Sequence, residues 1–285
     1  MNQSSSISVP QAGQNSKQSG HFLGVYIFRL HSGHRYILSH VFQGGEYVKP
    51  LPRVEEKWNF SPLCKEPIKI LWIMMFESHM NPKINVLTIA KRIYSNRLVI
   101  ASLGNVSCRE TEKSIAITPS GIDYEDLTID DIVTISYDGK VIEGAHAPSS
   151  ETPMHTLVYR EREDINGVVH THSLYASAFS VVNKEIPVDM VEVAAHVGGR
   201  VPVAPYRLPG TEELGREALS VLKERSACIL QNHGVLAIGD TLEKAYKAVA
   251  IVEIAARIHI LGSLIGTPSE IPIEDVQKLR AMYFK

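Results

Sequence analysis

Two histidines stand one residue apart in the stretch GVVHTHS, residues 167–173. His170 and His172 follow two valines, so the pattern predicts a buried strand on which both side chains project from one face. Two imidazoles on one face of a strand can bind the same cation, each at about 2.0–2.1 Å. Taken alone, the pair leaves open both metal binding and two unrelated polar residues.

A third histidine interrupts a second apolar segment, SACILQNHGVLAIGD, residues 226–240. His233 stands between two predicted strands and directly before Gly234. As a single residue it is better interpreted as a turn or capping residue. Together with His170 and His172 it gives three imidazoles, each where a buried strand opens into a loop. That set matches a catalytic zinc site or a site for a similar divalent metal.

A carboxylate stands near the start of the helix that we expect over residues 149–164. A metal site of this kind usually needs a carboxylate as base or temporary ligand, and Glu151 in PSSE is the candidate. The alternative is a first-turn glutamate that complements the helix dipole, and spacing alone favours that alternative. His155 follows four residues later on the same helical face. It is either a partner behind the metal site or, as the better interpretation, a histidine on the helix surface.

Three segments of small residues offer hydroxyls and backbone N–H groups that can hold an anion. They are SLGNVS (102–107), TPSG (118–121) and PSS (148–150). PSS stands at a predicted helix N-terminus, which favours a phosphate. Turn structure without a ligand explains the three segments equally well.

The elements that would position these residues begin at about residue 81. We expect helices over 85–99, 149–164, 174–182, 209–226, 241–262 and 273–283. Strands are expected at SIAI before TPSG, at 167–173, near 200–205 and on both sides of QNHG, with a hairpin over 131–144 that turns at Asp138-Gly139. Hairpins mixed with crossovers predict α/β layers around a mixed or mainly antiparallel sheet.

Composition describes an ordinary globular chain of 285 residues, 44% hydrophobic and 21% charged. A net charge of −2 gives no sign of a nucleic-acid partner, which usually requires a basic stripe. Cys64, Cys108 and Cys228 are odd in number and widely spaced, which favours a reducing compartment. The longest apolar run, ILWIMMF (70–76), is too short to cross a bilayer. We therefore expect a cytoplasmic protein with neither a nucleic-acid nor a membrane partner.

Residues 1–80 differ from the rest of the chain. Residues 1–20 are polar and of low complexity and are expected to be disordered. Residues 21–79 have no sustained period, and IKILWIMMF fits a strand or a helix. A native start at Met74, Met75 or Met80 is an equally good interpretation of the upstream part. We divide the chain into an N-terminal extension, 1–80, poorly ordered or a non-native start, and one domain, 81–285.

The motifs GNVS, ITPSG, a hairpin ending in EG, PSSE, VVHTHS, PYRLPGT and LQNHG occur in this order along residues 82–283. In order and spacing they resemble the class II aldolase/adducin-head family, and within it most of all the L-fuculose-phosphate aldolases. The resemblance implies a three-layer α/β/α fold around a mainly antiparallel sheet. It also implies a homotetramer with sites at subunit interfaces and one Zn²⁺ per subunit.

The resemblance implies a role for each matched motif. His170, His172 and His233 would be the zinc ligands, and Glu151 the catalytic acid/base. The substrate phosphate would be held by Ser102, Asn105, Ser120, Gly121, Ser149 and Ser150. The implied reaction is the reversible cleavage of a ketose 1-phosphate to dihydroxyacetone phosphate and an aldehyde. Zinc would stabilise the enediolate as a Lewis acid, and Glu151 would move the proton at the carbon that becomes the carbanion.

Related enzymes with this fold set the alternatives. L-ribulose-5-phosphate 4-epimerases carry Asp after PSS and a His-Ala-Asp stretch where this chain reads VEVAAHVGG (191–199), so Glu151 favours an aldolase. Methylthioribulose-phosphate dehydratases and 5-deoxyribulose-phosphate aldolases share the histidine and loop motifs. A non-enzymatic adducin-like module would have lost the ligands that this chain keeps.

Two tyrosines of the L-fuculose-phosphate aldolases lack a clear counterpart here. Glu192 or a neighbour occupies the position of the mid-chain tyrosine, and Tyr283 need not be equivalent to the C-terminal one. Both tyrosines serve the aldehyde half of the substrate, so the sequence leaves the identity of that aldehyde open.

Overall fold

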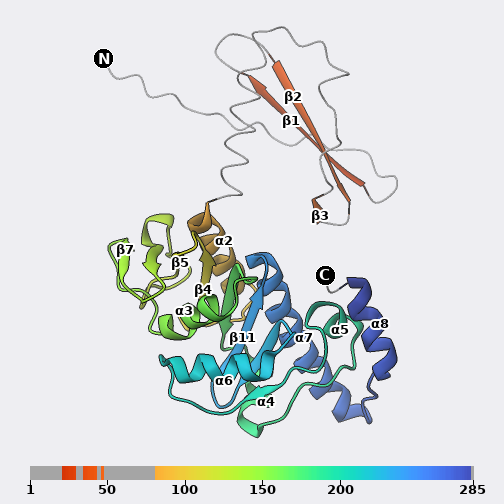
Figure 1. Ribbon diagram of the computed structural model, residues 1–285. Helices are drawn as coiled ribbons and strands as arrows, with labels where there is room; N and C mark the ends of the chain where they lie inside the picture. The colour runs from red at the N-terminus through yellow and green to blue at the C-terminus, as the bar shows by residue number, and fades with distance from the viewer. Residues whose placement is uncertain (1–20, 30–34, 44–45, 48–80, 284–285) are drawn as a thin grey trace, which may run out of the picture. The chain divides into compact units, whose positions relative to one another are not determined.

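The computed structural model describes residues 21–29, 35–43, 46–47 and 81–283 and divides the chain into two compact units (Figure 1). The units are Met1–Ile68 and Lys69–Lys285. The predictions for residues 1–20 and for IKILWIMMF lie outside the described residues.

The first unit contains an antiparallel sheet in the order β1-β2-β3. Its strands are β1 (His21–Arg29), β2 (Arg35–Gln43) and β3 (Glu46–Tyr47). The sequence pattern does not predict β1, because its apolar residues run almost without alternation.

The second unit holds the remaining elements. Its helices are α2 (Pro82–Ser95), η2 (Ile129–Asp131), α3 (Thr152–Glu161), α4 (Leu174–Val182), α5 (Val191–His196), α6 (Glu212–Leu222), α7 (Leu242–Ile265) and α8 (Ile273–Tyr283). Its strands are β4 (Gly104–Arg109), β5 (Ser114–Ile117), β6 (Val133–Ser136), β7 (Val141–Glu143), β8 (Gly167–Thr171), β9 (Val203–Ala204), β10 (Ala227–Leu230) and β11 (Gly234–Gly239).

These eight strands form one sheet in the order β7-β6-β5-β4-β8-β11-β10-β9. All neighbours are antiparallel except β9 and β10, which are parallel. The expected mainly antiparallel mixed sheet is therefore confirmed. Strand β8, which ends within the HTH motif so that His172 follows it directly, lies in the middle of the sheet between β4 and β11.

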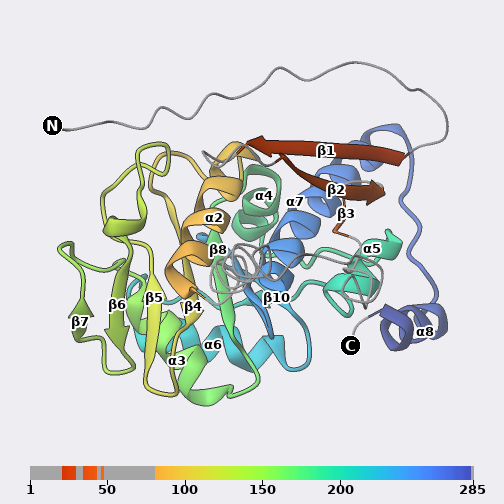
Figure 2. The same cartoon turned by 90° about the horizontal axis from the view of Figure 1, so that it is seen from above.

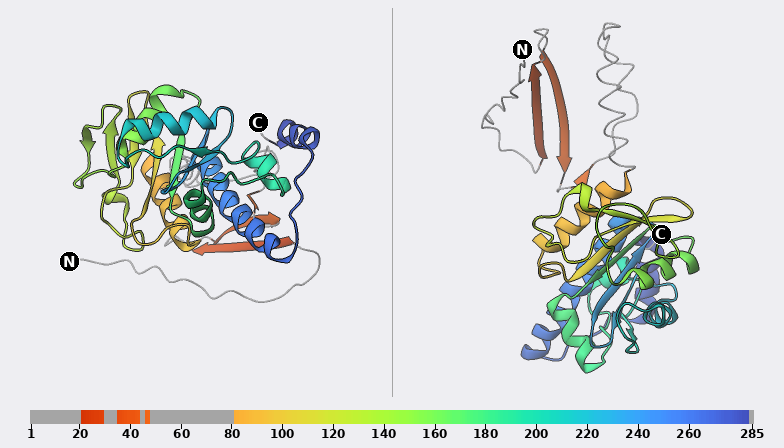
Figure 3. Two further views of the ribbon diagram at one scale, coloured as in Figure 1. Left: turned by 90° about the horizontal axis from the view of Figure 1, so that it is seen from below. Right: turned by 90° about the vertical axis from the view of Figure 1, so that its left-hand side faces the viewer.

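Helices cover both faces of this sheet, as Figures 2 and 3 show. Helices α2, α4, α5 and α7 contribute to one buried apolar cluster, and α3 and α6 contribute to the other. Successive residues of β8 alternate between them, with Val168 in the α3/α6 cluster and Val169 in the other. Each fully buried aliphatic side chain of this kind contributes about 1.5–3 kcal/mol relative to exposure. The three-layer α/β/α fold is confirmed.

Two elements near the motifs differ from the sequence-based expectation. GNVS was expected to be a loop, but Gly104–Arg109 is strand β4, paired with both β5 and β8. The short polar residues of β4 give no strand pattern in the sequence. They are buried because β5 and β8 lie on either side of the strand. Helix α5 lies in VEVAAHVGG, for which no element was expected.

One helix of the described residues, α7, is long and apolar enough to cross a membrane by length and composition alone. Core helices of globular proteins pass the same test. The buried residues of α7 extend from Leu242 to Ala256 and pack in the larger apolar cluster. This packing accounts for the apolar character of that part of the helix.

Candidate metal centre and active site

The HTH motif stands at the end of the central strand β8. The neighbouring strands β4 and β11 pair closely with β8 at this point. His170 pairs with Asn105 on β4 and with Leu236 on β11. A Cβ on Gly234 would lie 2.2 Å from the Thr171 carbonyl oxygen, so only glycine allows β11 to begin this close to β8. The glycine of QNHG therefore brings His233 beside the HTH motif.

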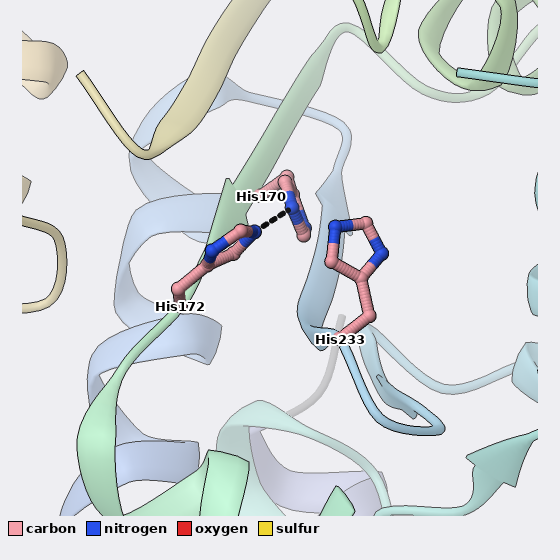
Figure 4. A group of neighbouring side chains, drawn as sticks. All are labelled: His170, His172 and His233. Carbon is pink, nitrogen blue, oxygen red and sulfur yellow. Dashed lines mark hydrogen bonds between the residues drawn. The ribbon is translucent and has the colours of Figure 1, made fainter. Parts of the chain in front are cut away.

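The three predicted ligands come together at this point (Figure 4). One potential ligand atom from each of His170, His172 and His233 lies within 4.8 Å of the others. The Nε2 atoms of His170 and His172 are 2.9 Å apart. His170 is fully buried, and the other two side chains are partly buried.

Hydrogen bonding fixes which nitrogen of His170 faces the cluster. Its Nδ1 lies 2.9 Å from the Val235 carbonyl oxygen, which can only accept a hydrogen bond. Nδ1 therefore carries the proton, and Nε2 presents its lone pair to the other rings. A carbonyl behind a histidine in this way is the usual support of a metal ligand.

All three imidazoles are held neutral. Burial and the neighbouring histidines lower the pKa of His170 well below its ordinary value. Burial lowers the pKa of His172 and, with help from His172, lowers that of His233 to about 4. Neutral imidazole is the form that binds a metal ion, so this donor set fits a divalent cation such as zinc.

Glu151 occupies the N-cap position of α3, makes no capping hydrogen bond with its side chain, and is 6% exposed. Burial raises the pKa of its carboxyl, while a hydrogen bond from the Gly210 backbone N–H acts in the opposite direction. Its Oε2 is buried and has no hydrogen-bond partner among the described residues. A buried carboxyl with raised proton affinity and a free oxygen is suited to accept and return a proton.

Two of the three small-residue segments lie side by side. Ser120 N–H donates to the Ala147 carbonyl at 2.9 Å, and Ser149 N–H donates to that of Thr118 at 3.1 Å. An isolated bridge joins Pro119 to the segment that holds Ser149. TPSG and PSS therefore form one paired loop next to Glu151.

The third segment joins this loop through strand β4. Val106 N–H donates to Thr118 Oγ1 at 3.2 Å, which places Asn105 next to TPSG. Ser120, Gly121 and Ser150 are exposed, whereas Asn105 and Ser149 are 4% and 7% exposed. Ser102 lies in the turn before β4 and makes no hydrogen bond to the loop within the described part of the chain.

Comparison with known proteins identifies the family of this domain. The model of the class II aldolase and adducin N-terminal domain family matches residues 85–260. A 5-deoxy-D-ribulose 1-phosphate aldolase of Bacillus thuringiensis serovar kurstaki is 35% identical over 195 residues, covering 68% of this chain and 91% of the relative. L-fuculose phosphate aldolase of Escherichia coli strain K12 is 41% identical over 165 residues, covering 58% and 76%. A solved L-fuculose 1-phosphate aldolase superposes with a TM-score of 0.68 at 33% identity, covering 71% of this chain and 96% of that one.

The chain belongs to the class II aldolase and adducin N-terminal domain family.

One residue beside the candidate site of this class II aldolase was not identified from the sequence. Tyr124 is fully buried, and its O–H donates to the Gly104 carbonyl at 2.7 Å and lies 3.4 Å from Thr118 Oγ1. It therefore ties the start of β4 to TPSG. An aromatic residue three positions after a turn glycine carries no signal for such a role.

The sequence misplaced His155. It is fully buried rather than on the helix surface, between Asn105 and Ser107 of β4.

Of the two positions that bear on the aldehyde, Glu192 is exposed in the first turn of α5, and Tyr283 is exposed at the end of α8.

Proposed function

We propose that this class II aldolase is zinc-dependent and reversibly cleaves a ketose 1-phosphate, similar to L-fuculose 1-phosphate, to dihydroxyacetone phosphate and an aldehyde. The observation that carries the proposal is the group His170, His172 and His233, whose potential ligand atoms lie within 4.8 Å of one another. Histidine ligands without a carboxylate favour zinc over magnesium or calcium. The chain is an aldehyde-lyase, and the metal and substrate are the parts to be tested.

Each group of residues has its own part in the reaction. His170, His172 and His233 would hold the zinc, which would supply Lewis-acid polarisation of the substrate carbonyl. Glu151 removes and returns the proton at the carbon that becomes the carbanion, for which its buried carboxyl with raised pKa is suited. No lysine Schiff base is required.

The paired loop holds the substrate phosphate away from the reacting carbons. Asn105, Ser120, Gly121, Ser149 and Ser150 supply amide, hydroxyl and backbone donors, and Ser102 joins them from the turn before β4. Binding energy from the phosphate then positions the reacting carbons at Glu151.

One relative supports a second substrate of the same class. The Bacillus thuringiensis relative acts on 5-deoxy-D-ribulose 1-phosphate, and this chain aligns with 91% of its length. We therefore include 5-deoxyketose 1-phosphates beside L-fuculose 1-phosphate as substrates. An L-ribulose-5-phosphate 4-epimerase or a phosphosugar dehydratase is the alternative activity of the same site.

The assembly proposed for this chain is a cytoplasmic homotetramer. Exposed apolar side chains on α4 and α7 support an interface between copies. They are Leu174, Val181, Val182, Ile254, Ile258 and Leu261. Light scattering on the purified protein measures the number of subunits directly.

The deciding experiment joins metal analysis to turnover. The purified protein should contain about one zinc per chain and should release dihydroxyacetone phosphate from L-fuculose 1-phosphate or 5-deoxy-D-ribulose 1-phosphate. A chain without a divalent metal would contradict the proposal. Turnover of L-ribulose 5-phosphate without cleavage would replace it by the epimerase.

Glu151→Gln tests the acid/base role. The variant should keep its zinc but lose at least about 100-fold in proton exchange at dihydroxyacetone phosphate, the order of general acid/base catalysis. Glu161→Gln, at the exposed other end of α3, is the control and should exchange normally. Unchanged exchange in Glu151→Gln would remove that residue from the mechanism.

A further inference from the structure

A row of polar side chains lies under α3, within an otherwise apolar layer. Asn105 and Ser107 alternate on β4 and therefore point to the same face of the sheet as His170, the strand partner of Asn105. His155 of α3 covers both of them. All four side chains are at most 4% exposed.

The two ring nitrogens of His155 are both engaged. Nε2 lies 2.5 Å from Asn105 Oδ1, and Nδ1 lies 2.6 Å from Ser107 Oγ. The Asn105 oxygen can only accept, so Nε2 carries the proton of the neutral ring. Nδ1 then accepts from the Ser107 hydroxyl.

Tyr159 also contacts Ser107 and bears on which atom donates in each of these hydrogen bonds. Its O–H lies 2.9 Å from both the carbonyl oxygen and the hydroxyl oxygen of Ser107. Because Nδ1 of the neutral His155 ring can only accept, the Ser107 hydroxyl donates to His155, and the Tyr159 O–H donates to Ser107. Burial lowers the pKa of His155 to about 3, which keeps the ring neutral with one donor and one acceptor. The donors therefore run from Ser107 through His155 to Asn105.

The remaining end of this chain of hydrogen bonds is the amide NH₂ of Asn105. This NH₂ group makes no hydrogen bond to any of the described residues. Asn105 itself is on strand β4, next to the TPSG segment of the paired loop. An asparagine side chain can present either its oxygen or its NH₂ group to a ligand, and only the NH₂ group favours an anion. With the oxygen held by His155, the NH₂ group is the one that remains.

We propose that His155 is a positioning residue, which holds the oxygen of Asn105 and thereby directs the Asn105 NH₂ group at the substrate phosphate. The inference rests on the proposed phosphate role of Asn105. In this inference His155 contacts neither the metal nor the substrate. It determines which end of the Asn105 amide, the oxygen or the NH₂ group, faces the phosphate. His155 acts on phosphate affinity and not on metal affinity.

The test measures two affinities in each variant, for inorganic phosphate by calorimetry on the zinc-loaded enzyme and for zinc by chelator competition. His155→Leu and Asn105→Ala should each weaken phosphate binding about tenfold or more, the expected loss for a hydrogen bond to a charged group. The double variant should bind phosphate no more weakly than Asn105→Ala. Zinc affinity should be unchanged in all of them.

Two further variants separate positioning from packing. His155→Gln keeps an N–H at the place of Nε2 and should stay within about threefold of the wild-type phosphate affinity. Thr156→Val alters a buried neighbour on α3 whose hydroxyl bonds within the helix, and should not change phosphate affinity.

The outcomes that overturn the inference are distinct. Normal phosphate affinity in His155→Leu with a loss in Asn105→Ala refutes the role of His155 and leaves the proposed function intact. Equal losses of zinc and phosphate affinity in both His155 variants show a merely structural histidine. Normal affinity in Asn105→Ala refutes the phosphate role of Asn105 itself, and the inference with it.

A second measurement does not depend on the Leu variant folding. ¹⁵N NMR of the histidine rings in the wild-type enzyme should place the His155 proton on Nε2. A proton on Nδ1 would present Nε2 as an acceptor, turn the Asn105 amide round and overturn the inference.

Discussion

Burial sets the protonation state of every histidine in the site. The pKa falls to about 3 for His155 and about 4 for His233, and it lies below the ordinary value for His170 and His172. Each ring is therefore neutral at physiological pH. For His170, His172 and His233 this leaves lone pairs for a cation, whereas in His155 the same neutrality gives a fixed donor and a fixed acceptor.

The neutral state of His155 predicts how stability changes with pH. Its folded pKa of about 3 lies below the ordinary 6.5, so below pH 6.5 the unfolded chain binds a proton that the folded chain does not. The free energy of unfolding should fall as the pH falls, by about 1.4 kcal/mol per pH unit at most for this residue. Urea unfolding of the metal-free protein should show the wild type losing roughly 1 kcal/mol more between pH 6 and pH 5 than His155→Gln. If the unfolding free energies of the two proteins changed equally with pH, His155 would not be the cause of the loss.

Removing one imidazole should cost metal affinity without unfolding the domain. His233 lies partly buried in a turn between β10 and β11, so His233→Ala leaves both strands in place. We expect zinc affinity to fall about 100-fold or more. This is larger than the roughly 10–100-fold loss usual for removing a residue that only hydrogen-bonds a metal ligand. His196→Ala, at an exposed histidine of α5, should bind zinc normally. Equal affinities in the two variants would exclude His233 as a ligand.

At the scale of elements, the site depends on how closely β11 approaches β8. In Gly234→Ala the new Cβ would lie 2.2 Å from the Thr171 carbonyl oxygen and 3.0 Å from the His172 ring. The start of β11 must move, so we expect a loss of about 2 kcal/mol or more in unfolding free energy together with weaker zinc binding. Gly266→Ala has no atom within 4 Å of the new Cβ and should change stability by about 0.5 kcal/mol at most. Thermal melting with and without zinc measures both effects, and a stable Gly234→Ala variant with normal zinc affinity would contradict the close fit.

Local patterns predict those elements whose own residues determine their burial. The segment Leu174–Val182 is helical as expected, Thr211 caps α6, and β10 and β11 flank QNHG. Strand β4 escaped prediction because its burial comes from β5 and β8 on either side. His155 was misplaced for the same reason, since only the packing of α3 on β4 buries it. Ligands that are close together in the chain can therefore be predicted from the sequence, whereas contacts between layers cannot.

At the scale of the whole molecule, every residue assigned to the site lies in the second unit. The family model matches residues 85–260, and the assigned residues extend from Ser102 to His233. The second unit has its own sheet, helices on both faces and two apolar clusters. The division of the chain at residue 80 remains a prediction, and it can be tested by removing the first part.

A chain of residues 81–285 should fold and act on its own. Because the members of both apolar clusters within the described residues lie from residue 86 onward, we expect the same melting temperature within a few degrees and one zinc per chain. The kcat/KM for the cleaved ketose 1-phosphate should match that of the full chain, since no assigned residue is lost. An Ala substitution at His233 in the shortened chain provides the inactive control. If the shortened chain were insoluble, or bound zinc but cleaved at least about tenfold more slowly, residues 1–80 would have to be counted as part of the enzyme.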